Sequence, residues 1–448
     1  MGEGRQARSY RTPTGDMTMQ SKLTRNALAA AITLLLQGGM GTAQAAVNVQ
    51  CPGDTNGDAV PESVVPGPNG GTVKCKHLVA GDGFAQMSDG HPAYTFGFAD
   101  KTGVAPADVI ADGILAARWP GSKIELDQGD ELFLSLTNVG TVMRPDLFAP
   151  HTVHYHGFPN AATVFDGVPE VSISINMGST LTYYYNNVEP GTYIYHCHVE
   201  ATEHMEMGML ANLYVHPKQD ETGYGGNPNT VAGRKGGPGP WGYTYNDGDG
   251  TTAFDVEAPI QVSGFDGEFH DASILVQPLP FSTLETNYPQ INGRGYPDTI
   301  KTVAVDPLNP GPGEMGAPVD DGFLGEPGAV LNNGEVSQDM GSAISVNAGQ
   351  KLLLRLSNVS IDRFFTLTAH GLKMRIVGTG ARQMRGITGK NIYRDVASVN
   401  FGGGETHDVI IDTTGVAPGT YFLTAMEFYQ MSNKTQLDGG LMTEIVVN

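Results

Sequence analysis

An internal repeat constrains this chain more than any other feature of its sequence. Three short motifs occur twice in the same order: Leu132–Val139 and Leu352–Val359, Pro190–Tyr193 and Pro418–Tyr421, and His156–Gly157 and His370–Gly371. Motifs that recur in a constant order indicate a duplicated structural unit. Because 448 residues also exceed what one hydrophobic core usually supports, we expect two copies of one domain.

The composition favours β-structure in both copies. The chain has 60 glycines and 28 prolines, and only 16% of its residues are charged. Such a composition is typical of many short strands joined by tight turns. The fold class that we predict is therefore all-β.

Stretches rich in glycine and proline divide the chain into segments. Residues 219–258 are predicted to be a linker, since this composition does not sustain a helix or an interior strand. A similar stretch, Pro307–Gly334, is predicted to be an insertion within the second copy. The expected segments are a signal peptide (1–45), a loop bounded by cysteines (46–80), the first domain (81–218), the linker (219–258) and the second domain (259–448).

The N-terminal residues are typical of an export signal. Lys22 and Arg25 precede the apolar run Ala27–Leu36, and Ala43-Gln44-Ala45 provides a small-residue cleavage site. We therefore expect a periplasmic or extracellular protein, whichever of the early methionines starts the chain. Once the signal is removed, no remaining apolar run is long enough to predict an integral membrane span.

The charge balance of the chain argues against two kinds of partner. It has 47 acidic and 26 basic residues, for a formal net charge of -21. An acidic surface repels nucleic acid and anionic lipid, so neither is expected to bind. Charge alone identifies no substrate, because acidity also serves solubility.

The three cysteines fall into two groups. In an oxidising compartment Cys51 is predicted to pair with Cys75, which leaves Cys197 as a lone thiol between two histidines. Between the paired cysteines, Asp54, Asn56 and Asp58 alternate as in a calcium loop. Because the sixth loop position is not glycine, the alternatives are a calcium site and a solvated acidic turn.

Two short segments carry the pattern of a metal site. The first contains His151, His154 and His156, and the second contains His196, Cys197 and His198. In a strand, alternate side chains share a face, so we expect His196 and His198 to face one way and Cys197 the other. One strand would then serve two sites.

The residues that follow complete a copper ligand set. His204 and Met209 come soon after the cysteine. Two imidazoles, one thiolate and a weak axial thioether are the ligands of a blue, type 1 copper. Singly these residues are ordinary, but two His-x-His pairs around a flanked cysteine predict copper binding.

This constellation resembles the copper domains of multicopper oxidases, the laccase-like family, in a form with two cupredoxin domains and kinship to copper nitrite reductases. The resemblance implies two Greek-key β-sandwiches, of which the second carries no copper of its own. It implies type 1 ligands at His151, Cys197, His204 and Met209, and type 2/type 3 ligands at His154, His156, His196 and His198. Asp166 resembles the acidic residue that assists proton delivery, although Asp-Gly is also a common turn pair.

The second copy departs from the family pattern. A three-copper cluster needs four His-x-His pairs, whereas this chain has two. In the repeat, His154 and His156 correspond to Thr368 and His370, and His196–His198 corresponds to Thr424–Met426. Three alternatives remain: a reduced site of one or two coppers, completion by His370 or His407 of a neighbouring subunit, for which a homotrimer is the expected assembly, or ligands from another polypeptide.

The resemblance implies a copper-dependent oxidoreductase. Electrons from a phenol, a metal ion or a redox protein would enter at the type 1 copper and pass through Cys197 to the histidine-ligated copper. Oxygen, or an oxyanion such as nitrite, would be reduced there. The alternatives are a nitrite-reductase-like enzyme and a copper protein that carries electrons or handles copper without oxidase activity.

Overall fold

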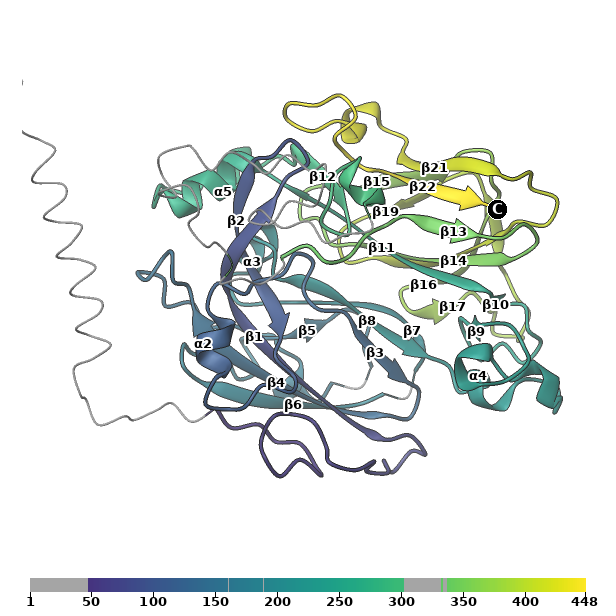
Figure 1. The fold of residues 1–448 in the computed structure, drawn as a ribbon, viewed down its shortest axis with the longest axis horizontal. Coiled ribbons are helices and arrows are strands. Elements are labelled where there is room, and N and C mark those ends of the chain that lie inside the picture. The colour runs from purple at the N-terminus through teal and green to yellow at the C-terminus, as the bar shows by residue number, and fades with distance from the viewer. Residues whose placement is uncertain (1–46, 160, 188, 302–331, 333–336) are drawn as a thin grey trace, which may run out of the picture. The chain divides into compact units, whose positions relative to one another are not determined.

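The computed structural model describes residues 47–159, 161–187, 189–301, 332 and 337–448. The predicted signal peptide lies outside the described residues, as does the predicted insertion Pro307–Gly334 except for Asn332. The described residues confirm an all-β fold built from two β-sandwich domains (Figure 1). Within them, no helix is long and apolar enough to cross a membrane.

The first domain is a sandwich of two four-stranded sheets. One sheet has the order β2-β1-β4-β6, with strands β1 (Val73–Gln86), β2 (Pro92–Asp100), β4 (Glu131–Gly140) and β6 (Thr180–Asn186). The other has the order β3-β8-β7-β5, with strands β3 (Ile124–Asp127), β5 (His154–Tyr155), β7 (Gly191–His196) and β8 (Leu210–His216). Their inner faces share one core, to which Leu78, Leu134, Tyr183 and Leu213 contribute.

The second domain repeats this arrangement with additional strands. Its larger sheet has the order β12-β11-β14-β20-β16-β17, and β18 also pairs with β16. These strands are β11 (Val256–Phe265), β12 (Tyr288–Ile291), β14 (Lys351–Asn358), β16 (Met374–Thr379), β17 (Arg382–Gln383), β18 (Arg394–Val396) and β20 (Thr406–Asp412). The smaller sheet has the order β13-β22-β21-β15-β19, with β13 (Ile344–Val346), β15 (Phe365–Ala369), β19 (Val399–Phe401), β21 (Gly419–Ala425) and β22 (Met442–Val447).

The strand pairings explain the sequence repeat. The first repeated motif lies on β4 and on β14, and each of these strands pairs in parallel with the first long strand of its domain and antiparallel with a later one. The Pro-Gly-Thr-Tyr motifs lead into β7 and β21, which occupy equivalent places in the sheets β3-β8-β7-β5 and β13-β22-β21-β15-β19. The repeated motifs therefore lie on equivalent strands of the two domains.

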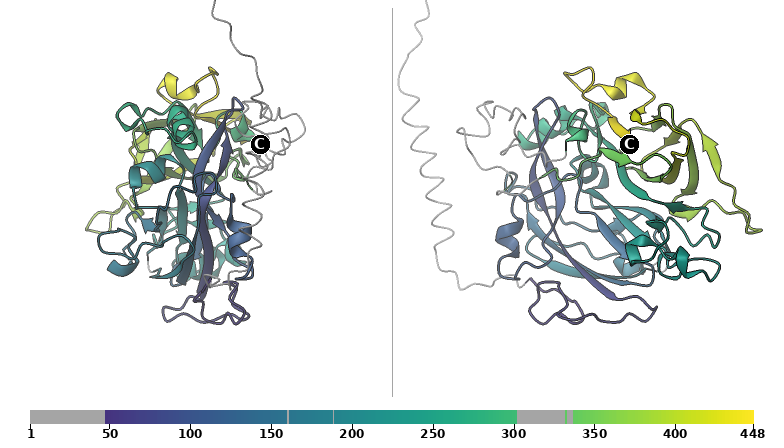
Figure 2. Two further views of the ribbon diagram at one scale, coloured as in Figure 1. Left: turned by 90° about the vertical axis from the view of Figure 1, so that its left-hand side faces the viewer. Right: turned by 45° about the vertical axis from the view of Figure 1, so that its right-hand side comes forward.

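A shared apolar core joins the two domains. Trp119 of the first domain stacks on Phe265 of the second, with ring centroids 4.3 Å apart, and its indole N–H donates to Gln290. The long strand β1 reaches the second domain, where the side chain of Gln338 bonds both backbone groups of Gln86. In Figure 2 this purple strand extends as far as the green segments of the second domain.

Short helices occupy the connections between strands. The α-helices are α2 (Val109–Gly113), α3 (Ala201–Glu206), α4 (Gln219–Thr222) and α5 (Gly267–Ile274). The 3-10 helices are η1 (Thr163–Phe165), η2 (Pro228–Thr230), η3 (Gly233–Lys235), η4 (Phe281–Thr283), η5 (Asp298–Ile300) and η7 (Phe428–Met431). Helix α3 lies in the loop between β7 and β8 and contains His204, one of the predicted ligands.

Residues 219–258 fold rather than forming the predicted linker. They contain α4 and the hairpin of β9 (Gly242–Tyr243) and β10 (Ala253–Phe254), and β11 already starts inside them. The buried carboxylate of Asp247 accepts hydrogen bonds from three backbone N–H groups and from the side chain of Gln219. Glycine and proline break regular elements here, but buried side-chain hydrogen bonds still order the segment.

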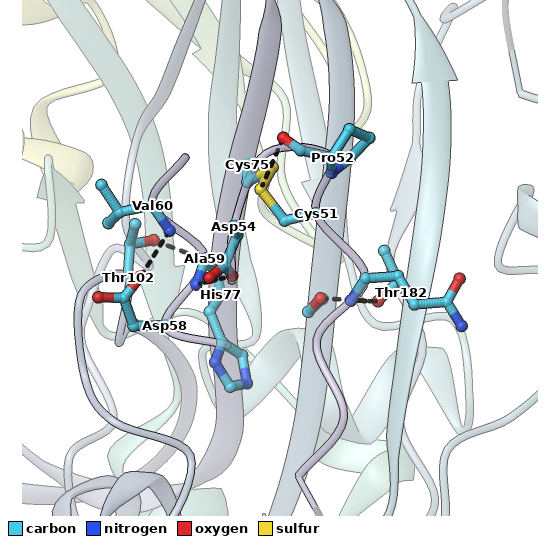
Figure 3. Close-up of a disulfide and its surroundings, with 12 residues drawn as sticks. Cys51, Pro52, Asp54, Asp58, Ala59, Val60, Cys75, His77, Thr102 and Thr182 are labelled. Atoms are coloured by element: carbon cyan, nitrogen blue, oxygen red, sulfur yellow. Dashed lines mark hydrogen bonds between the residues drawn. A yellow bond between two sulfur atoms is a disulfide. The ribbon is translucent and has the colours of Figure 1, made fainter. Parts of the chain in front are cut away.

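The segment 46–80 is also more regular than predicted. Its last residues form the start of β1, where Cys75 pairs with Phe133 of β4, so only the part before Val73 is a loop. The predicted disulfide between Cys51 and Cys75 is confirmed, with the two Cα atoms 5.9 Å apart (Figure 3). It attaches this loop to the first sheet.

The acidic loop gives no support for calcium. The carboxylate of Asp54 accepts hydrogen bonds from the backbone N–H groups of Asn56, Gly57 and Ala59, and Asp58 accepts from Val60 (Figure 3). None of these residues joins a potential metal-ligand group among the described residues. The calcium alternative is set aside, because the loop uses its own oxygens to hold its turn.

Candidate metal centres

Strand pairing brings the two histidine segments together. β5 pairs antiparallel with β7 so that His154 lies opposite His196 and Tyr155 lies opposite Tyr195. The backbone N–H of His156 continues this pairing to the carbonyl of Ile194 at 3.0 Å. Residues 151–156 therefore run beside the end of the strand that carries Cys197.

His151, Cys197 and His204 form a first group of potential ligands, which we call the cysteine group. One ligand atom from each lies within 4.8 Å of the others. The Cys197 Sγ is 3.2 Å from Nδ1 of His204 and 3.7 Å from Nδ1 of His151. Helix α3 presents His204, whose backbone N–H donates to the carbonyl of Glu200 at 3.1 Å.

Met209 lies against the cysteine group through its backbone. Its carbonyl accepts the N–H of Cys197 at 3.2 Å, and its own N–H donates to the carbonyl of His204 at 2.9 Å. The Met209 side chain is completely buried in the same apolar core as Cys197. The backbone thus holds all four predicted type 1 residues at one end of the sandwich.

Burial sets the protonation of the cysteine group. It raises the pKa of the Cys197 thiol to about 11, lowers that of His204 to about 4 and lowers that of His151 well below its usual value. Neutral imidazoles keep a free lone pair, which a metal ion requires. A buried thiolate needs a cation to offset its charge, so the donor set fits a soft metal ion such as copper.

His154, His156 and His196 form a second group, which we call the histidine group. Their ligand atoms also lie within 4.8 Å of one another, and the Nε2 atoms of His156 and His196 are 2.9 Å apart. Burial is the main cause that lowers the pKa of His196 to about 3, and it also lowers the pKa of His156. All three residues are predicted ligands.

Each ring of the histidine group is anchored by its other nitrogen. The Nδ1 atoms contact backbone carbonyls: His154 that of Asp166 at 2.6 Å, His196 that of Cys197 at 2.7 Å and His156 that of Gly404 at 3.4 Å. A hydrogen bond at one imidazole nitrogen fixes the tautomer and orients the other toward a metal. The Nε2 atoms are therefore prepared as ligands, and three imidazoles fit copper.

His198 lies beside the histidine group rather than within it. Its ring centroid is 5.0 Å from that of His154 and 5.6 Å from that of His196. β7 ends at His196, yet the predicted alternation persists, because Cys197 faces the cysteine group while its two neighbours face the other side. Cys197 is thus joined by one peptide bond to His196 of the histidine group and by another to His198 beside that group.

Asp166 lies next to the histidine group, as predicted. Its Oδ2 is 3.7 Å from Nδ1 of His154, and its side chain is 35% exposed. Its backbone also ends the short helix η1, so it serves a turn as well. The position is compatible with both alternatives from the sequence, the proton-delivery residue and the turn residue.

Neither His370 nor His407 joins a ligand group among the described residues. His370 is exposed and its Nε2 contacts the hydroxyl of Thr424 at 2.9 Å, whereas His407 lies on β20 against the ring of Phe401. The second domain lacks the pair of opposed histidines that the first domain has on its neighbouring strands. Thr368 lies opposite Thr424 where the first domain has His154 opposite His196.

The sequence did not predict that His156 of the histidine group borders a cavity formed largely by the second domain. His156 forms part of the wall of a cavity of about 450 Å³ whose other residues come largely from the second domain. That wall includes Met205, Arg363, Phe364 and the turn Gly402–Glu405. The run of three glycines in the turn was the available signal, since close backbone approach favours glycine.

The fold and both groups define a cupredoxin-type copper protein with one ligand-bearing domain and one ligand-poor domain. Residues 107–220 and 295–448 each match a family model described as multicopper oxidase. The chain belongs to the multicopper oxidase family, whose members are copper-dependent oxidoreductases.

The sequence also resembles copper-containing nitrite reductases over a short segment. The chain is 30% identical over 117 residues to a copper-containing nitrite reductase of Neisseria meningitidis serogroup B, and 30% identical over 115 residues to that of Neisseria gonorrhoeae. These matches cover 25% and 24% of this chain, respectively, and 27% of each relative. The matched segment thus spans only about a quarter of these curated relatives.

Solved structures resemble the chain over most of its length. A blue copper oxidase from Nitrosomonas europaea has a TM-score of 0.56 and 20% identity, covering 84% of this chain and 86% of that one. The multicopper oxidase mgLAC has a TM-score of 0.55 and 18% identity, with the same coverage. A copper nitrite reductase from Nitrosomonas europaea has a TM-score of 0.50 and 14% identity, covering 84% and 94%. These likenesses establish the shared fold.

Proposed function

We propose that this chain is an exported oxidoreductase in which an external donor delivers electrons at the cysteine group and an acceptor is reduced at the histidine group. One observation carries the proposal: Cys197 belongs to the first group while His196 and His198, its neighbours in the chain, lie at the second. Copper bound at both groups supplies one-electron redox chemistry. The chain provides a short covalent path between them.

The surroundings of the two groups suit these separate tasks. His151, Cys197 and His204 are at most 1% exposed, so water is kept away from the electron-entry site. His156, in contrast, borders the 450 Å³ cavity, which gives a small acceptor access to the histidine group. Oxygen is the first candidate acceptor, and nitrite is the second because of the segment shared with nitrite reductases.

Because the ligand set is incomplete, the second candidate function is a carrier of electrons or of copper. Thr368 and Thr424 stand where ligands would be needed for a larger cluster within this chain. A carrier of electrons or of copper would need only the cysteine group. A histidine from a neighbouring copy of the chain, as in a homotrimer, would instead complete the acceptor site.

Copper counting tests these alternatives. The purified, copper-loaded protein should bind at least two coppers per chain, show an intense blue absorption band and consume either oxygen or nitrite when supplied with a reductant. One copper per chain without turnover would establish the carrier instead. A colourless protein after loading would contradict both.

Export is proposed from the predicted signal peptide together with the Cys51–Cys75 disulfide, which is stable in oxidising compartments. Fractionation of the producing cells, with detection of the mature N-terminus near Ala46, tests it. Retention of the full-length chain in the cytoplasm would contradict export.

Asp166→Asn distinguishes the two roles of that residue. The variant keeps the backbone carbonyl that anchors His154 but removes the carboxylate charge beside it. If Asp166 delivers protons, turnover should fall by about 100-fold or more at unchanged copper content, which is the usual range for general acid–base groups. Glu170→Gln removes an exposed charge nearby and should leave turnover unchanged. Equal rates in both variants would assign Asp166 to the turn alone.

A further inference from the structure

We propose that Gly404, in the ligand-poor second domain, is a positioning residue that holds the His156 ring for metal binding in the first domain. This inference rests on the proposed function, because it assumes that the histidine group binds copper. It gives the second domain, which has few ligands of its own, a role in metal binding by the first.

The contact between the two residues is specific. The carbonyl of Gly404 lies 3.4 Å from Nδ1 of His156, and the ring places its Nε2 2.9 Å from that of His196. A carbonyl on the far side of an imidazole restrains both its tautomer and its rotation. His154 and His196 take their restraint from residues of the first domain, so His156 alone depends on the second.

The turn that carries Gly404 is itself firmly held. The Gly404 N–H donates to the carbonyl of Asn358 at 2.9 Å, and the Asn358 N–H returns a bond to the carbonyl of Glu405 at 3.1 Å. The Glu405 carboxylate also accepts the N–H of Gly402 at 2.7 Å. Because the turn is tied to β14 in this way, it acts as a fixed wall for the His156 ring.

Any side chain larger than that of glycine at position 404 would collide with the His156 ring. A Cβ atom at Gly404 would lie 2.7 Å from Nδ1 and 2.8 Å from Cε1 of His156, closer than real contacts allow. Gly404 also has a φ of +87°, which L side chains rarely adopt. A methyl group here would push the ring out of place, because the ring moves more easily than the turn.

Gly415 offers a matched control at the other end of the same strand. It follows β20, has a φ of +79° and would place a Cβ with nothing within 4 Å. Gly415→Ala therefore carries the backbone strain of Gly404→Ala without the clash. Any difference between the two variants reports the contact with His156.

The experiment measures copper at each group separately in the full-length protein. Relative to Gly415→Ala, the Gly404→Ala variant should bind copper at the histidine group about 10- to 100-fold more weakly, the usual effect of removing an outer-sphere partner. Its electron paramagnetic resonance signal from imidazole-bound copper should decrease. The blue band of the cysteine group should keep its position and intensity, which also shows that the first domain is folded.

Glu405→Ala is a second variant that loosens the turn without adding bulk. It should weaken copper at the histidine group in the same direction but less, since only the Gly402 hydrogen bond is lost. Equal copper affinity in Gly404→Ala and Gly415→Ala, or parallel loss of the blue band and the imidazole signal, would overturn the inference. Failure of the proposed function is distinct, because the unmodified protein would then bind no copper at one or both groups.

Discussion

Cys197→Ser should abolish the blue absorption band and reduce donor-dependent turnover by more than about 100-fold. Loss of a residue that only orients a metal ligand usually costs up to about 100-fold, and loss of a ligand itself should cost more. Serine has nearly the same shape as cysteine but provides no thiolate, so the cysteine group loses the soft ligand that lies 3.2 Å from His204. Absorption spectroscopy and steady-state rates measure both effects.

Copper at the histidine group should survive this substitution. The anchors of His154, His156 and His196 are backbone carbonyls, and a serine at position 197 leaves the carbonyl bonded to His196 in place. Copper content should therefore fall by the cysteine-group copper alone. Met207→Leu is a suitable control, since Met207 is fully buried nearby but is not among the predicted ligands. A blue band that persists without Cys197 would overturn the assignment of this ligand.

The link between Cys197 and its two neighbours was accessible from the sequence because it depends on local geometry. Successive residues of a strand face opposite sides whatever the rest of the fold does. The repeat was equally informative, since its motifs lie on strands whose pairing decides the topology of each domain. Eight predicted ligands thus gather in one place, six of them in two compact groups.

Other features escaped prediction because they depend on contacts between distant residues. His156 and Gly404 are 248 positions apart, and neither residue alone indicates the other. The segment 219–258 was assigned by composition, which does not reveal that Asp247 becomes buried and fully bonded. The acidic loop near Asp54 left a calcium site and a solvated turn as alternatives, because the spacing of carboxylates does not show whether backbone N–H groups already occupy them.

A buried ion network of the second domain, which contacts β7 of the first, leads to the prediction with the largest effect on stability. Arg355 of β14 is completely buried, forms an ion pair with Glu257 and lies 3.5 Å from Asp408. It also donates to the hydroxyl of Thr192, at the start of β7, the strand that ends directly before Cys197. Burial opposes ionisation of Glu257, yet the charge of Arg355 holds its pKa below the usual value. The network therefore ties β7 of the first domain to the larger sheet of the second.

Arg355→Met should lower the free energy of unfolding by about 3–5 kcal/mol at pH 7, because the partly buried carboxylate of Glu257 and the buried carboxylate of Asp408 lose the guanidinium charge that faces them. Arg375→Met is the matched control: Arg375 pairs with Asp395 at 2.6 Å but is 53% exposed, so the loss should be about 1 kcal/mol or less. Since a lowered folded-state pKa stabilises the protein above the unfolded pKa, the contribution of Glu257 is lost as the pH falls. The deficit of Arg355→Met should accordingly shrink in acid, as urea unfolding at several pH values would measure. A deficit no larger than that of Arg375→Met would show that water or neighbouring donors replace the guanidinium and that the network does not hold the domains together.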